Sequence, residues 1–69
     1  MTNAYNDLYY LNMDKLFTVE EVSEKLQVHW QTVLNYIKSG ELRAVRIGRG
    51  YRIAPEDLQS FIEARKTRN

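Results

Sequence analysis

The stretch TVEEVSEKLQVHWQTVLNYIKSG, residues 18–40, contains the signals of two short helices separated by a tight turn. Thr18 and Glu21, three residues apart, form a capping box, in which each side chain pairs with a backbone N–H group at the start of a helix. Apolar residues then recur at the spacing of one helical face, at positions 19, 22 and 26. This pattern predicts a helix over residues 19–26.

A second helix is predicted over residues 30–38, WQTVLNYIK. His29 precedes it as the N-cap, although serine and aspartate are preferred at that position. Ser39-Gly40 ends it, because glycine readily adopts the left-handed conformation that terminates many helices. Two short helices joined by a tight turn form a helix-turn-helix motif.

A β-hairpin is predicted next, because apolar residues alternate with arginines on both sides of a glycine-rich loop. The loop Gly48-Arg49-Gly50 fits a three-residue connection with Gly50 in the left-handed conformation. That register places Arg46 opposite Arg52 on the outer face of the hairpin. It also turns four apolar side chains toward the core, namely Val45, Ile47, Tyr51 and Ile53.

A third helix is predicted in PEDLQSFIEARK, residues 55–66. Pro55 suits the first helical position, and the two acidic residues behind it suit the positive end of the helix dipole. The apolar stripe of this helix consists of Leu58, Phe61 and Ile62. With 69 residues, the chain has room for a single domain with a small core.

The composition excludes several functional classes. The chain has no cysteine and one histidine, which leaves few routes to a metal site or an activated nucleophile. We therefore expect no enzyme, no metal and no cofactor. No apolar run approaches the ~20 residues of a membrane span, and no signal-peptide pattern follows Met1. We expect a soluble protein of the prokaryotic cytoplasm with no membrane partner.

Positive charge is concentrated in the second half of the chain. Residues 1–34 have a balance of −3 and residues 35–69 a balance of +4. Four arginines recur at every third position with no acidic residue among them: Arg43, Arg46, Arg49 and Arg52. A strand edge kept charged against aggregation is one explanation. We favour an anionic partner, because arginine binds phosphate with two parallel hydrogen bonds.

Polar side chains of the second helix complete a nucleic-acid-binding pattern. Gln31 and Asn35 can each pair bidentately with adenine, and Lys38 can reach guanine or phosphate. Ten residues are expected to contact DNA: His29, Trp30, Gln31, Thr32, Asn35, Lys38, Arg43, Arg46, Arg49 and Arg52. Trp30 fits a packing role as well as a backbone contact, and His29 fits a cap or a phosphate contact better than a base contact.

Residues 16–62 resemble the excisionase family of small DNA-binding domains, relatives of the MerR-like winged helix-turn-helix. The motifs that carry the resemblance are TVEE, SGEL, AVRIGR, YRI and EDL, in the order of the chain. The resemblance implies a mainly α fold with a small β-hairpin, that is, three helices plus a two-stranded wing. It also implies that the second helix enters the major groove while the arginine-rich wing lies on the backbone or in the minor groove.

The sequence departs from the family pattern at four positions. Glycine or asparagine is usual at Gln27, serine at His29, arginine at Asn35 and proline at Arg43. These changes leave the base preference open. We expect a winged helix-turn-helix DNA-binding domain over residues 16–66, with a tyrosine-rich N-terminal arm at 1–15 and a tail at 67–69.

By this resemblance the chain is expected to bind double-stranded DNA as a recombination directionality factor of a mobile element, with an integrase or recombinase as a further partner. A small transcription regulator is the alternative within the family. MerR-type regulators continue into a dimerisation helix and an effector domain, and we expect neither here. The alternative from another class is a protein-interaction adaptor that uses the same fold to dock an integrase, a repressor or its own copy. The tyrosine-rich arm motivates it, because tyrosine is common in interface cores. Weak self-association and cooperative binding on DNA are further alternatives that the sequence leaves open.

Overall fold

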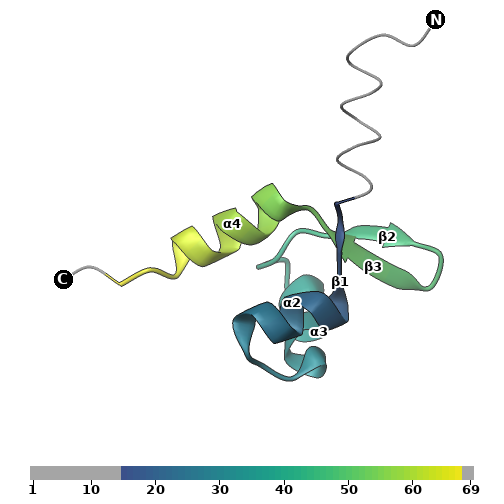
Figure 1. Cartoon of the computed structure of the whole chain (residues 1–69), viewed down its shortest axis with the longest axis horizontal. Helices are drawn as coiled ribbons and strands as arrows, with labels where there is room; N and C mark the ends of the chain where they lie inside the picture. The colour runs from purple at the N-terminus through teal and green to yellow at the C-terminus, as the bar shows by residue number, and fades with distance from the viewer. Residues whose placement is uncertain (1–14, 68–69) are drawn as a thin grey trace, which may run out of the picture.

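The computed structural model describes residues 15–67. Within them, three helices and three strands follow one another as β1 (Phe17–Thr18), α2 (Val19–Leu26), α3 (Trp30–Lys38), β2 (Val45–Ile47), β3 (Gly50–Ile53) and α4 (Pro55–Ala64). Helices α2 and α3 form a pair, and the β2–β3 hairpin and α4 extend to opposite sides of it (Figure 1). The predicted arm lies outside the described residues, apart from Lys15, and so do the last two residues of the predicted tail.

The capping box at the start of α2 is confirmed. The Thr18 Oγ1 atom accepts a hydrogen bond from the Glu21 backbone N–H at 3.1 Å, and the Thr18 N–H donates to Glu21 Oε1 at 2.9 Å. Helix α2 ends at Leu26, and its C-cap, Gln27, has a left-handed φ of 58° and ψ of 46°. This backbone conformation disfavours most residues with a Cβ atom. Glycine suits the position because it has none, and asparagine is tolerated because its short polar side chain can hydrogen-bond locally.

Both ends of α3 agree with the sequence pattern. The N-cap is His29, and its Nδ1 atom accepts a hydrogen bond from the Gln31 backbone N–H at 3.1 Å. At the other end, Ser39 is the C-cap and Gly40 follows with a φ of 84°. The helix-turn-helix therefore lies over the residues predicted for it.

The register of the hairpin differs from the prediction by one residue. Strands β2 and β3 pair Arg46 with Tyr51 and Ile47 with Gly50, so the loop contains two residues, Gly48 and Arg49. Gly48 has a φ of 61°, whereas Gly50 has no positive φ. A two-residue loop with glycine first and only that glycine at positive φ is typical of the type II′ turn, which matches the twist of a hairpin.

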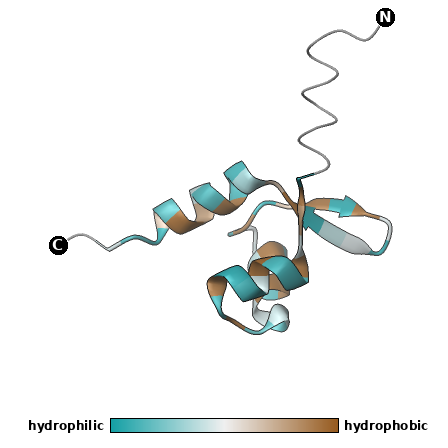
Figure 2. Ribbon diagram, in the orientation of Figure 1, coloured by the Kyte–Doolittle hydropathy of each residue, from teal (hydrophilic) through white to brown (hydrophobic). Residues whose placement is uncertain are grey.

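The one-residue shift moves side chains to the other face of the sheet. Val45 and Ile47 do not face the core and are 49% and 44% exposed. The predicted opposition of Arg46 and Arg52 is also wrong, because Val45 is the residue that pairs with Arg52. Of the four apolar side chains expected in the core, only Ile53 is fully buried. In Figure 2 the projecting strand β2 carries both hydrophobic and hydrophilic residues.

A third strand extends the sheet beyond the predicted hairpin. Strand β1 pairs antiparallel with β3, so the strand order is β1-β3-β2 and β2 lies at an edge. Strand β1 was not predicted, because two residues are too few to show an alternating pattern. Because β1 leads directly into α2, this pairing ties the base of the hairpin to the helix-turn-helix.

The core lies where both helices of the motif, the sheet and α4 meet. Its buried side chains come from every one of these elements and from the α3–β2 connection: Val22, Val33, Leu42, Ile53, Leu58 and Phe61. At the outer end of α4, Arg65 forms an ion pair with Glu41 and its guanidinium carbon lies 3.8 Å from the centre of the Phe61 ring. These contacts fasten α4 to the end of α3, on the side away from the hairpin.

Candidate nucleic-acid interface

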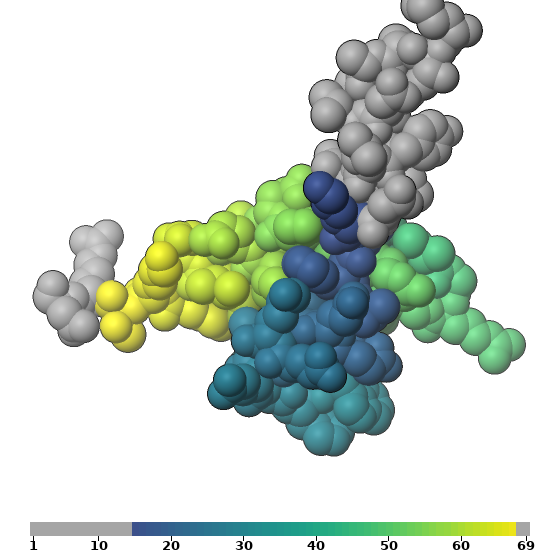
Figure 3. Space-filling model, in the orientation of Figure 1, coloured from purple at the N-terminus to yellow at the C-terminus, as the bar shows by residue number. Residues whose placement is uncertain are grey.

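A groove of about 540 Å³ separates α3 from the hairpin. Its walls come from the start of α2, one side of α3 and the hairpin, and its lining residues are Val19, Glu20, Trp30, Leu34, Lys38, Arg46, Arg49, Gly50, Tyr51 and Arg52. Figure 3 shows the hairpin projecting from the body of the molecule, so that this groove is open to solvent. Five of the ten residues predicted to contact DNA line it.

The α3 wall of the groove is a row of residues spaced four apart. Trp30, Leu34 and Lys38 follow one another along the helix at this spacing and therefore lie one above another on one face. The Trp30 side chain is 47% exposed, and its ring lies 5.2 Å from the ring of His29. This wall is apolar near the start of α3 and cationic at its end.

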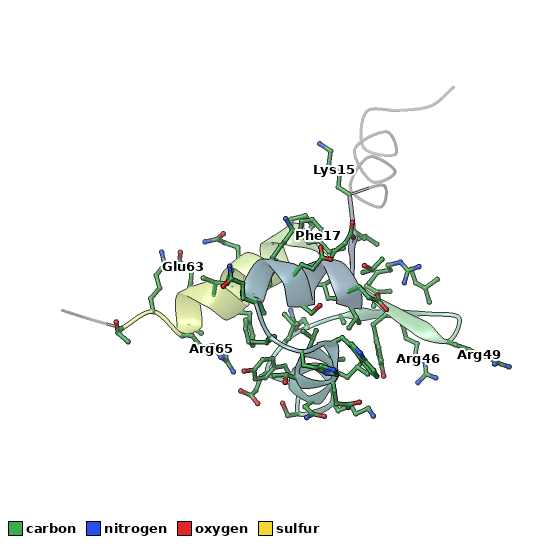
Figure 4. The ribbon with its side chains drawn as sticks, turned by 60° about the horizontal axis from the view of Figure 1, so that its bottom comes forward. Lys15, Phe17, Arg46, Arg49, Glu63 and Arg65 are labelled. Carbon is green, nitrogen blue, oxygen red and sulfur yellow. The ribbon has the colours of Figure 1, made fainter. Side chains whose placement is uncertain are left out.

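The hairpin wall carries three of the predicted arginines. Arg46 lies opposite Tyr51, with its guanidinium carbon 5.7 Å from the centre of the tyrosine ring. Arg49 lies in the turn and extends from the tip of the hairpin, while Arg46 points toward the side on which α3 lies (Figure 4). Arg52 is half-buried, and its Nη1 atom donates to the Tyr51 carbonyl oxygen at 2.9 Å.

The electrostatic balance of the groove is strongly positive. Four cationic residues line it against one acidic residue, a net charge of +3. Within residues 15–67, the ion pairs are Arg65–Glu41 and Lys66–Glu63, so no described carboxylate pairs with a groove cation. The groove cations are thus available to an external anion as far as the described residues go.

The polar ridge of α3, formed by Gln31 and Asn35, lies beside the groove. Both side chains are exposed, and the Gln31 Nε2 atom donates to Asn35 Oδ1 at 3.3 Å. This hydrogen bond leaves Gln31 Oε1 as an acceptor and Asn35 Nδ2 as a donor. Thr32 lies farther around the helix and is half-buried.

His29 combines two chemical properties at the start of α3. Because its Nδ1 atom accepts the capping hydrogen bond, the neutral ring carries its proton on Nε2. The side chain is exposed, so that Nε2–H group is a donor at the helix N-terminus, where anions are favoured. The structure therefore lets His29 cap the helix and contact a phosphate at the same time.

Arg43 lies apart from the other predicted residues. It lines a separate hollow beside α4, together with Glu41, Asp57 and Ser60. The spacing of three residues that links it to Arg46 in the sequence does not continue in space, because Arg43 precedes β2. Because Arg43 does not line the groove, its position does not support the predicted DNA contact.

Sequence reasoning missed three groove residues of functional interest. These are Glu20, Leu34 and Tyr51, of which only Tyr51 was assigned from the sequence, to the core. A signal for Leu34 was present, since it lies midway between Trp30 and Lys38 at helical spacing. Glu20 and Tyr51 could not be assigned to the groove without knowing the register of the hairpin and its position relative to α2.

Metal sites and membrane spans are both absent from the part of the chain that the structure describes. Across residues 15–67, no three histidine or acidic side chains gather in a way that could hold a metal ion. None of the described helices has the length and apolar character needed to cross a membrane.

Comparison with known proteins finds a matching family model and several relatives. Residues 16–66 match the family model described as a helix-turn-helix domain. An uncharacterized protein of Mycobacterium tuberculosis is 41% identical over 51 residues, which are 74% of this chain and 45% of that protein. The protein YvgK of Bacillus subtilis is also 41% identical over 51 residues, which are 74% of this chain but 17% of that protein.

A further relative carries a functional description in its name. A Mycobacterium tuberculosis protein named "Putative DNA-binding protein" is 37% identical over 49 residues, covering 71% of this chain and 63% of that protein. The chain spans less than half the length of the uncharacterized mycobacterial protein and of YvgK. The similarity to all three is therefore confined to one part of each relative.

Proposed function

We propose that this chain, which belongs to the helix-turn-helix domain family, binds double-stranded DNA through α3 and the groove beside it. The observation that carries the proposal is the adjacency of the polar ridge of α3 to a groove lined by four cations. Phosphate contacts position a protein on DNA, whereas contacts to base edges specify the sequence. This surface offers both kinds of contact side by side.

In the proposed complex, α3 enters the major groove of the DNA. The DNA backbone lies in the protein groove between α3 and the hairpin. Lys38 and Arg46 flank that backbone from its two sides. Arg49, at the tip of the hairpin, then reaches the adjacent minor groove or its phosphates. The apolar ring of Trp30 faces the sugars, which present the least polar surface of the backbone.

The polar ridge of α3 favours adenine at one position of the target. Adenine presents an N6 donor and an N7 acceptor in the major groove. The hydrogen-bonded amides of Gln31 and Asn35 together offer the complementary acceptor and donor. Because the two amides are already oriented by their mutual hydrogen bond, less side-chain entropy is lost on binding.

The biological role that we infer is architectural or regulatory and involves no catalysis. The resemblance to excisionases supports a recombination directionality factor of a mobile element, with an integrase or recombinase as a protein partner. A small transcription regulator uses the same DNA-binding surface and differs only in its target. Binding to the ends of the element, rather than to a promoter, would distinguish the first role from the second.

The exposed strand β2 favours a second candidate function, that of a protein-interaction adaptor. Val45 and Ile47 are about half exposed, and β2 lies at the edge of the sheet with one side unpaired within the described chain. Such an edge can accept a strand from a partner. A Val45→Thr, Ile47→Thr double variant that keeps its DNA affinity but no longer associates with the partner would support this function.

The salt dependence of binding tests the DNA-binding proposal. If the four groove cations neutralise phosphates, the logarithm of affinity should fall against the logarithm of salt concentration with a slope of about −3.6. Fluorescence anisotropy of labelled duplexes at several salt concentrations measures this slope. A flat salt response, or the same affinity for every duplex sequence, would contradict the proposal.

A further inference from the structure

Glu20 is the one acidic side chain among the residues that line the groove. It is exposed and lies in the first turn of α2, where the helix dipole favours an acid. The capping box, however, is made by Glu21, so the Glu20 carboxylate is not needed for it. Helix stability accounts for an acid in this turn but does not explain an acidic residue in the lining of a groove whose other charged residues are all cationic.

We propose that Glu20 is a specificity-determining residue of the DNA-binding surface, an inference that rests on the proposed function. Its carboxylate repels phosphates that enter the groove near the start of α2. The four cations hold a phosphate backbone whatever the DNA sequence is, and such contacts supply essentially all of non-specific binding. A carboxylate in the same groove weakens the non-specific mode in which the backbone is free to approach it.

In the sequence-specific complex, the repulsion between Glu20 and the phosphates is weaker. Base contacts from Gln31 and Asn35 fix the register of the protein on the duplex. In that register the backbone lies toward Lys38 and the hairpin arginines, and a fixed distance separates it from Glu20. On non-specific DNA no base contact imposes the register, and the protein samples positions in which a phosphate meets the carboxylate.

The matched control is Glu24, which is exposed on the same helix but does not line the groove. The substitutions Glu20→Gln and Glu24→Gln change the net charge equally and remove a carboxylate from α2 in each case. Long-range electrostatic attraction to DNA is therefore altered to a similar extent in both variants. Any difference between them reports on the position of the carboxylate.

The experiment compares the two variants on two duplexes. One duplex carries the tightest-binding sequence selected from a random library with the wild-type chain, and the other is a scrambled version of the same length. Glu20→Gln should raise affinity for the scrambled duplex by about three- to tenfold, the range expected for removing a repulsion between close charges partly screened by water. It should raise affinity for the selected duplex less, so that the ratio of the two affinities falls.

Glu24→Gln should change both affinities by the same small factor, and Glu20→Asp, which keeps the charge, should behave like the wild type. The inference is overturned if Glu20→Gln matches Glu24→Gln, or if it raises both affinities equally. Those outcomes leave wild-type DNA binding intact and so spare the proposed function. If the wild-type chain shows no salt-dependent binding to either duplex, the proposed function itself fails, and this inference fails with it. Thermal melting of each variant confirms that the fold is retained.

Discussion

Arg46 and Tyr51 stand directly opposite each other on strands β2 and β3, and the arginine lies over the tyrosine ring at 5.7 Å. This pairing replaces the repulsive pair of arginines that the sequence suggested. The side chain of Arg46 therefore needs no bound anion to be stable in its position, since cation–π contacts are favourable by about 0.5–1 kcal/mol at exposed sites. The ring instead orients the guanidinium group toward the groove before any ligand arrives.

Arg46→Ala should weaken binding to all duplex sequences alike, because a phosphate contact carries no sequence information. The magnitude of the salt slope should fall by about 0.9, the contribution of one phosphate contact. Tyr51→Leu should weaken binding less and leave the slope unchanged, because the cation remains while its orienting ring is lost. Anisotropy titrations over a range of salt concentrations measure both effects. A change of base preference in Arg46→Ala would argue against a phosphate contact.

Asn35→Ala should instead relax the preference for one base pair, by about 1–3 kcal/mol of discrimination, with the salt slope unchanged. Selection from a random duplex library, repeated with the variant, measures the change. Gln59→Ala is the matched control, because Gln59 on α4 forms a similar exposed hydrogen bond, to Glu63 four residues later. If Asn35→Ala weakens binding to every sequence by the same factor, the ridge of α3 does not read bases.

Gln27→Gly should stabilise the domain by about 1 kcal/mol, because the left-handed conformation strains a residue with a Cβ atom by about 1–2 kcal/mol. For a domain of this size that gain corresponds to a rise in Tm of about 4–8 °C. Differential scanning calorimetry measures it. Gln59→Gly supplies the opposite control, since glycine inside α4 should destabilise by about 1 kcal/mol. Equal effects of the two substitutions would contradict the assigned conformation of residue 27.

The helices were predictable because their determinants are local. Signals such as a capping box, an N-cap or a terminal glycine act within a few residues. Those in residues 18–40 therefore predicted α2 and α3 with their observed bounds. The hairpin register was not predictable in the same way. Both Gly48-Arg49 and Gly48-Arg49-Gly50 are acceptable loops, and the choice depends on which side chains of β2 share the face of the sheet on which Ile53 is buried.

The candidate site, too, was predictable where its determinants are local and not where they depend on how elements pack together. The polar ridge and the presence of an arginine-rich hairpin followed from helical period and charge. The composition of the groove did not, because it depends on distances between elements: the start of α2 contributes Glu20, while Arg43 faces another hollow. Leu42 was likewise missed as a core residue, since it belongs to no periodic segment and is buried by the turn of the chain after α3.

A comparison of Leu42→Ala with Ile47→Ala tests the register of the hairpin. The Leu42 side chain is 1% exposed and that of Ile47 is 44% exposed. Removing a buried leucine side chain destabilises a protein by about 2–5 kcal/mol, whereas truncating a half-exposed one should cost below about 1 kcal/mol. Urea denaturation measures both free energies of unfolding, with Leu42→Val as a milder substitute should the alanine variant be unfolded. With a three-residue loop, Ile47 would face the core and the two costs would be similar, and that result would rule out the pairing of Arg46 with Tyr51.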